Sequence, residues 1–146
     1  MDDLARLTRW MVYQHFAQTG TAPPFDRLVR LVDRPADEVR AALGRLDQAH
    51  QVVLASDGES IHMAHPFAGY ASGVTVDAGG TRYAANCIWD GLALPALLGR
   101  DAVVEAEAVR GAPFRFQIRD GVLASTVSWI HLQVPAARFW DDIGYT

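Results

Sequence analysis

The spacing of apolar side chains predicts helices in the first third of the chain and a hairpin after them. Apolar residues recur three and four positions apart, as on one face of a helix. The helices expected from this pattern cover residues 4–18, 25–32 and 35–50. Two further apolar stretches, 52–55 and 60–63, flank Asp57-Gly58, a pair typical of a β-turn.

The second half of the chain changes to short extended stretches separated by turns. The strands expected there cover residues 74–76, 82–85, 103–109, 114–119, 122–126 and 128–134, and a short helix or turn follows over 135–140. Asp120-Gly121 predicts a hairpin between two of these strands. One apolar helix is inserted between strands; we expect Asn86 to cap its start and Pro95 to end or kink it.

These elements predict an α+β fold in two parts. Residues 1–66 would form a three-helix winged-helix-like domain, and residues 73–146 an antiparallel-sheet lobe whose inserted helix carries the site. Winged helices commonly read DNA with the third helix. Residues 1–66, however, hold seven arginines against nine acidic residues, without the basic footprint of a DNA reader. We therefore expect a packing or lid domain and no nucleic-acid partner.

Composition places the chain among ordinary globular proteins. Its net charge is −4, and all 13 basic residues are arginine. The longest apolar stretches are too short to cross a bilayer, and Met1-Asp2-Asp3 is unlike the start of a signal peptide. The single cysteine excludes an intrachain disulfide and fits a reducing compartment. A cytoplasmic protein without membrane contact is expected.

Candidate chemistry centres on Cys87, the only cysteine, and on Asp90 three residues later. In the first turn of the inserted helix, the positive end of the helix dipole would favour a thiolate. Residues three apart share a helix face, so the thiol and the carboxyl group would point the same way. The structural alternative is a small buried cysteine and an acidic residue that only complements the dipole.

The segment around this pair resembles the core of the organomercurial (alkylmercury) lyase family. The resemblance lies in an aromatic residue, Tyr83, then Cys87-x-x-Asp90, then Pro-Ala-Leu-x-Gly-Arg over 95–100. It implies protonolytic cleavage of a carbon–mercury bond in a small organomercurial. Cys87 would be the mercury-binding thiolate, which suits a soft metal, and Asp90 the proton donor. No cofactor is implied, since Hg(II) is a product ligand.

Four aromatic residues are candidates for the walls of a substrate pocket, although core packing is the commoner reason for each: Tyr83, Trp89, Phe139 and Trp140. No spacing gathers the histidines, so His50, His62, His65 and His131 receive no role. The chain also lacks paired-cysteine zinc spacing and glycine-rich phosphate motifs.

One departure from the resembled family concerns a second catalytic cysteine, which the resemblance places late in the chain. Here Val134-Pro135 and residues 139–146 occupy that region without a cysteine. A shortened chain, a reading frame ended at a codon that can encode selenocysteine, and a member without a second thiol all remain open. With Cys87 alone, cleavage should be slow unless an external thiol supplies the other ligand. A missing final strand would leave an unpaired sheet edge, which favours a homo-oligomer.

Two other functions fit the same residues. The first is a lyase-like enzyme recruited to other chemistry, in which Cys87 and Asp90 act on a small apolar substrate. The second is a regulator, in which a winged helix is joined to a metal- or ligand-sensing lobe.

Overall fold

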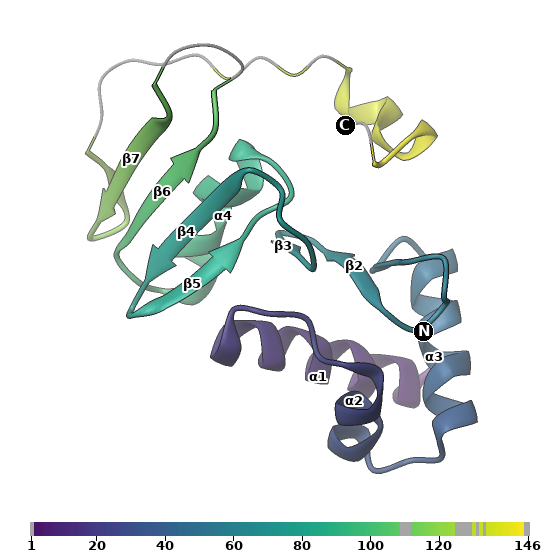
Figure 1. The fold of residues 1–146 in the computed structure, drawn as a ribbon. Coiled ribbons are helices and arrows are strands. Elements are labelled where there is room, and N and C mark those ends of the chain that lie inside the picture. The colour runs from purple at the N-terminus through teal and green to yellow at the C-terminus, as the bar shows by residue number, and fades with distance from the viewer. Residues whose placement is uncertain (1, 109–111, 125–129, 131, 133, 145–146) are drawn as a thin grey trace.

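The computed structural model of the chain describes residues 2–108, 112–124, 130, 132 and 134–144. It combines helices with two antiparallel sheets, so the α+β class predicted from the sequence is confirmed (Figure 1). In the part that is described, no helix is both long and apolar enough to span a membrane.

Three helices open the chain, close to the positions that apolar spacing predicts. They are α1 (Asp3–Thr19), α2 (Phe25–Val32) and α3 (Ala36–Gln48). Asp2 caps α1, because its carboxylate accepts the Ala5 N–H at 2.8 Å. The buried face of α3 repeats at helical spacing and consists of Val39, Ala42, Leu43 and Leu46. The helices therefore form because each buries one apolar stripe.

A small antiparallel sheet follows the helices, with the strand order β1-β2-β3. Its strands are β1 (Val53–Leu54), β2 (Ile61–Ala64) and β3 (Phe67–Ala68). The predicted turn is present, and Asp57 stabilises it by accepting the N–H groups of Glu59 and Ser60. An isolated bridge pairs Phe67 with Ala85, so this sheet reaches the second half of the chain.

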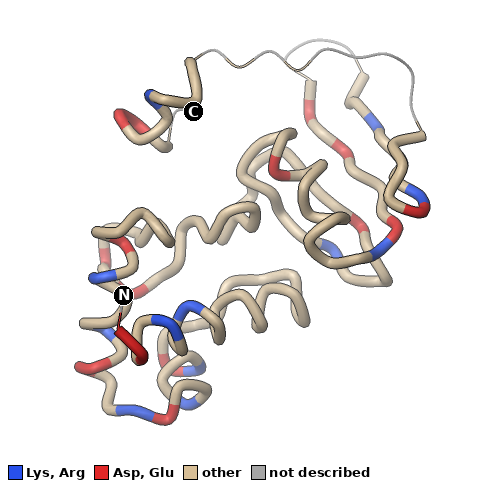
Figure 2. Tube along the Cα trace, turned by 180° about the vertical axis from the view of Figure 1, so that it is seen from behind, with Lys and Arg blue, Asp and Glu red and all other residues tan. Residues whose placement is uncertain are grey.

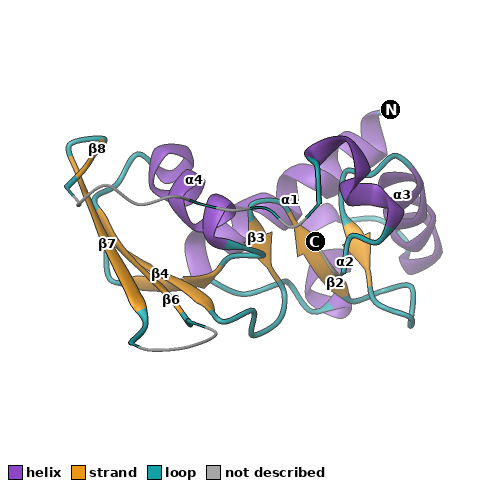
Figure 3. Cartoon of the chain, turned by 90° about the horizontal axis from the view of Figure 1, so that it is seen from above, coloured by secondary structure: helices purple, strands orange, loops and turns teal. Residues whose placement is uncertain are grey.

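The second sheet has five strands in the order β5-β4-β6-β7-β8, all antiparallel. They are β4 (Val74–Ala78), β5 (Thr81–Ala84), β6 (Ala102–Ala106), β7 (Phe114–Arg119) and β8 (Val122–Leu123). The inserted helix α4 (Ile88–Leu98) lies on one face of this sheet (Figure 3). The 3₁₀ helix η1 (Ala136–Asp141) confirms the short helix or turn predicted near the end. The strand predicted over 128–134 lies mostly outside the described residues.

The prediction that Pro95 ends or kinks α4 is wrong about where the helix ends. Pro95 lies inside α4, and Gly99, with φ of 62°, ends it. Proline in this position removes one backbone hydrogen bond near the end of the helix. Leu94 and Pro95 are both buried, so packing against the sheet maintains the last turn.

A single hydrophobic core joins the helices to the five-stranded sheet. The Phe16 ring of α1 stacks on Phe67 of β3, with 5.0 Å between ring centroids. The Tyr83 hydroxyl of β5 donates to the Ala17 carbonyl of α1 at 2.9 Å. The N-terminal helices thus hold the edge of the second sheet, and with it the start of α4.

Two glycines provide a matched test of the contact between the end of α1 and β5. Gly20, with φ of 78°, ends α1, and a Cβ there would lie 2.0 Å from the Arg82 carbonyl oxygen. Gly44, inside α3, has no such neighbour within 4 Å. We expect Gly20→Ala to lower the free energy of unfolding by more than about 2 kcal/mol. Alanine disfavours the left-handed backbone at this position, and its Cβ would push α1 away from the Arg82 carbonyl of β5. Gly44→Ala should raise the free energy of unfolding by about 0.5–1 kcal/mol through helix propensity.

Urea denaturation of both variants measures this difference. Equal effects of the two substitutions would show that the contact between α1 and β5 contributes little to stability.

Candidate active site

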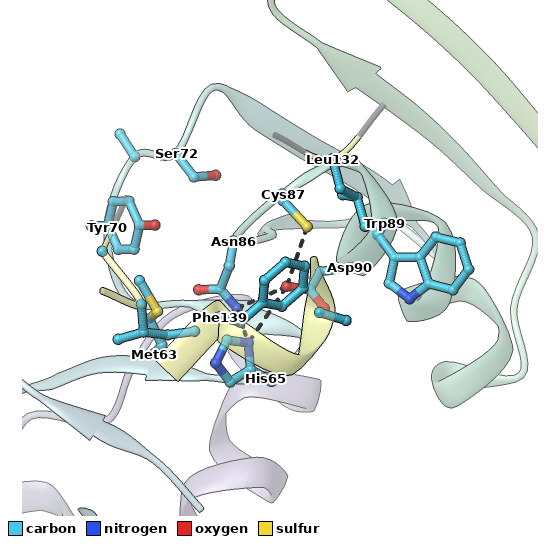
Figure 4. A pocket seen from close by; sticks show the side chains of 14 residues that line it. Met63, His65, Tyr70, Ser72, Asn86, Cys87, Trp89, Asp90, Leu132 and Phe139 are labelled. Carbon is cyan, nitrogen blue, oxygen red and sulfur yellow. Dashed lines mark hydrogen bonds and ion pairs between the residues drawn. The ribbon is translucent and has the colours of Figure 1, made fainter. Parts of the chain in front are cut away.

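A cavity of about 670 Å³ opens at the N-terminal end of α4. Four parts of the chain form its walls: the β2–β3 region, the segment before β4, the start of α4 and the C-terminal segment around η1 (Figure 4). The lining residues are Met63, His65, Tyr70, Ala71, Ser72, Asn86, Cys87, Trp89, Asp90, Leu132, Ala136, Phe139, Ile143 and Gly144. Both predicted catalytic residues are among them.

Cys87 and Asp90 meet at the start of α4. Cys87 is the N-cap residue, with extended backbone, and its carbonyl accepts the Gly91 N–H at 2.9 Å. The prediction that Asn86 is the cap and Cys87 a first-turn residue is therefore off by one position. The Cys87 Sγ lies 3.8 Å from the Asp90 Oδ2, so thiol and carboxyl group are neighbours as the spacing predicts.

The charge state of Cys87 differs from the sequence prediction. Burial raises the pKa of the Cys87 thiol above its ordinary value, and the negative charge of Asp90 raises it further. The backbone N–H groups of Asp90 and Trp89 lower the pKa but do not outweigh burial. The helix end therefore does not produce a resting thiolate: the sulfur carries its proton and can donate it to Asp90.

Two further polar side chains contact Asp90 within the same wall. The Asn86 Nδ2 lies 3.2 Å from the Asp90 Oδ2 and 3.1 Å from the His65 Nδ1. The His65 Nδ1 lies 3.5 Å from the same Asp90 oxygen. Figure 4 shows these three side chains together beside the Cys87 sulfur. Asn86 and His65 thus both contact the Asp90 carboxyl group, and the Asp90 side chain is 17% exposed.

His65 is the functional candidate that sequence reasoning missed. It belongs to the turn between β2 and β3 of the small sheet, 25 residues before Asp90, which lies on α4. No spacing rule relates two such positions; only the packing of α1 and β3 against the second sheet brings them together. The other ring nitrogen of His65, Nε2, is buried and has no hydrogen-bond partner among the residues that the structure describes.

The four aromatic residues predicted to line the pocket differ in where their side chains lie. Trp89 and Phe139 line the cavity, although the Trp89 indole is 64% exposed and is turned away from the polar cluster (Figure 4). Trp140 does not line it, but stacks on the His50 ring at 3.9 Å and meets the His65 ring edge-on at 6.0 Å. The prediction that Tyr83 lines the pocket is wrong, because its side chain is fully buried in the core and does not reach the cavity.

Several lining residues carry no sequence signal. Met63, Tyr70, Ser72 and Leu132 come from a strand end, a linker and the C-terminal segment. Tyr70 stacks on the His62 ring with 4.3 Å between centroids, and burial raises the pKa of its hydroxyl. Only the tertiary structure shows that these side chains face one cavity.

The cavity offers one strong ligand for a soft metal, Cys87. Among residues 2–108, 112–124 and the described part of the C-terminal segment, no three histidine, cysteine, aspartate or glutamate side chains could hold a metal ion together.

Comparison with known proteins finds a matching family and related solved structures. The sequence model of the alkylmercury lyase family, MerB, matches residues 71–145. A solved structure, the mercury-bound form of MerB2, superposes with a TM-score of 0.66 at 20% sequence identity. The match covers 86% of this chain and 60% of the MerB2 chain, so the chain spans about three fifths of that relative. No curated protein matches significantly.

The raised pKa of Cys87 leads to a test with iodoacetamide, which alkylates the thiolate. We expect the alkylation rate to rise only at a pH above the usual thiol range. Asp90→Asn should move this midpoint to lower pH, because the substitution removes a negative charge and a hydrogen bond that both raise the pKa. Burial remains, so the midpoint should not fall to that of an exposed thiol on a helix N-terminus.

Asp77→Asn is the matched control, since Asp77 pairs with Arg82 on the sheet and does not line the cavity. An unchanged midpoint in Asp90→Asn would show that the carboxyl group does not influence the sulfur.

Proposed function

The chain belongs to the alkylmercury lyase family, and on that basis we propose that it cleaves carbon–mercury bonds by protonolysis. One observation carries the proposal: the only cysteine of the chain lies 3.8 Å from a carboxyl group at the wall of a cavity. Cys87 would bind mercury, and Asp90 would deliver the proton. The substrate is a small organomercurial, and no resident cofactor takes part.

Mercury binding to Cys87 would transfer to Asp90 the proton that the cleavage step needs. The neutral Cys87 thiol attacks mercury. A sulfur–mercury bond forms, and the bond between mercury and the anion of the organomercurial salt breaks, so that the anion leaves. The thiol proton moves to the Asp90 Oδ2, its hydrogen-bond acceptor. The raised pKa of Cys87 supports this order of events, because the sulfur still carries its proton when the substrate arrives.

Cleavage would then return this proton to carbon. The electron pair of the carbon–mercury bond takes the proton from Asp90 and becomes a carbon–hydrogen bond, so a hydrocarbon leaves. Mercury stays on Cys87 with one positive charge, and Asp90 is again a carboxylate. The sulfur opposite the carbon donates electron density to mercury, which makes the carbon more basic, and the adjacent acid provides general acid catalysis.

An external thiol would complete the cycle. Its sulfur binds mercury, and its proton passes to Asp90. A second thiol then displaces Cys87 and gives its proton to the Cys87 sulfur, so that mercury leaves as a bis-thiolate. Asp90 releases its proton to solvent and is again a carboxylate. Two observations support this step: Cys87 is the only cysteine among residues 1–146, and the described side chains include no group of three metal ligands.

The organic group of the substrate would lie against the apolar wall of the cavity. Met63, Leu132, Phe139 and Ile143 form that wall, with Trp89 at its exposed side. The Trp140 contact with His50 holds η1, and therefore Phe139, over the cavity. Apolar walls exclude water from the reacting carbon and strengthen the electrostatic interactions there.

We assign residues 1–66 to a winged-helix-like domain that supports residues 73–146, the lyase-like domain. Its contacts with the site favour a packing role: the Tyr13 hydroxyl donates to the His65 carbonyl at 2.9 Å. Positive and negative residues alternate along the three N-terminal helices without gathering in a basic stripe (Figure 2), which argues against binding DNA. At the far edge of the sheet, β8 exposes Val122 and Leu123, a surface on which a second copy of the chain could pair.

Hydrocarbon release from phenylmercury in the presence of excess small thiol tests the proposed function. We expect the wild type to release benzene with a rate that rises with thiol concentration, and at most one equivalent without thiol. Cys87→Ser should abolish release and mercury binding, since oxygen is a poor ligand for a soft metal. Asp90→Asn should still form the phenylmercury adduct, detected by mass spectrometry, and lose at least about 100-fold in release.

The alternatives predict different results. Tight 1:1 binding of Hg(II) without release of benzene would favour a mercury sensor, and a salt-dependent shift of duplex DNA would add a regulatory role. Absence of any adduct would favour an enzyme recruited to other chemistry.

A further inference from the structure

The Asn86 carboxamide lies where negative charge develops when Asp90 gives up its proton. Its Nδ2 is 3.2 Å from the Asp90 Oδ2, the oxygen that also faces the Cys87 sulfur. In the proposed cleavage step, the proton leaves this oxygen for the carbon, and the oxygen becomes fully anionic. A fixed N–H donor at that position stabilises the charge more in the transition state than before it.

The contact with His65 decides which end of the carboxamide faces Asp90. The two hydrogens of Nδ2 can serve two acceptors, and the second one is the His65 Nδ1 at 3.1 Å. In this arrangement the His65 Nδ1 is an acceptor, and the ring hydrogen lies on Nε2. The opposite orientation of the amide would set its oxygen 3.2 Å from the carboxylate oxygen, which is repulsive.

We propose that Asn86 is a positioning residue for protonolysis, which stabilises the Asp90 carboxylate as it forms, and that His65 holds the Asn86 amide in the orientation that this requires. The inference rests on the proposed function and assigns roles to two residues that the Cys-x-x-Asp pattern does not include. The burial of the Asn86 Oδ1, which has no partner among the described residues, agrees with an amide oriented by its amino group.

The experiment separates adduct formation from hydrocarbon release. Phenylmercury is mixed with each variant, the adduct on Cys87 is quantified by mass spectrometry, and benzene release is followed in a single turnover. We expect Asn86→Ala to form the adduct at a rate within about threefold of the wild type and to release benzene about 10- to 100-fold more slowly. Asn86→Asp, which keeps the shape but removes the donor, should be at least as slow.

Two substitutions of His65 test the orienting role. His65→Asn places an amide oxygen at the position of Nδ1, where it can still accept from Asn86, and should retain most of the activity. His65→Gln, whose oxygen lies one bond further out, should slow release about 3- to 10-fold. His15→Gln on α1 is the control, because His15 does not line the cavity.

A readout independent of catalysis is the ¹⁵N spectrum of the His65 ring in the wild type. We expect the ring hydrogen on Nε2 and a bare Nδ1 that accepts from Asn86. A ring protonated at Nδ1 would overturn the orienting role, and equal rates of release in wild type and Asn86→Ala would overturn the role of Asn86. Equal losses in adduct formation and release would also overturn it, because they indicate a general disturbance. If the wild type forms the adduct but releases no benzene, the proposed function fails instead.

Discussion

The contact between the Cys87 thiol and the Asp90 carboxyl group is the interaction on which the proposed chemistry of this protein depends. One helical turn separates the two residues, and the N-terminus of α4 aims both at the same cavity. Burial raises the pKa of the Cys87 thiol, so in the proposed reaction mercury binding and the transfer of the thiol proton to Asp90 are one event. Under this proposal, the proton that cleaves the carbon–mercury bond comes from the residue that binds the metal.

The rest of the fold keeps this pair in place. The five-stranded sheet supports α4, where Gly91 allows the helix to approach Val74 and Val104 closely. The N-terminal helices hold β5 through the bond between Tyr83 and Ala17, and they carry the turn that supplies His65. The two halves share a core, so a change far from the cavity, at the end of α1, would disturb the start of α4.

The single thiol distinguishes the site from a closed metal centre. A cysteine with a carboxyl group and an imidazole beside it can bind mercury and protonate carbon, but it cannot surround the product ion with sulfur. In the proposed cycle, release of mercury therefore uses thiols from solution. Trp89, which lines the cavity, is exposed on its outer side.

The sequence by itself determined the elements and the neighbouring pair Cys87 and Asp90, because both depend on local rules. Helical spacing, the turn at Asp57-Gly58 and the interval between Cys87 and Asp90 act over a few residues, and the structure has each of them. Local rules failed where long-range packing decides: Pro95 stays inside α4, Tyr83 enters the core, and the pKa of Cys87 rises. Only the tertiary structure placed His65 and Asn86 around Asp90, because burial and contacts between distant segments are set by how the two sheets and α1 pack together.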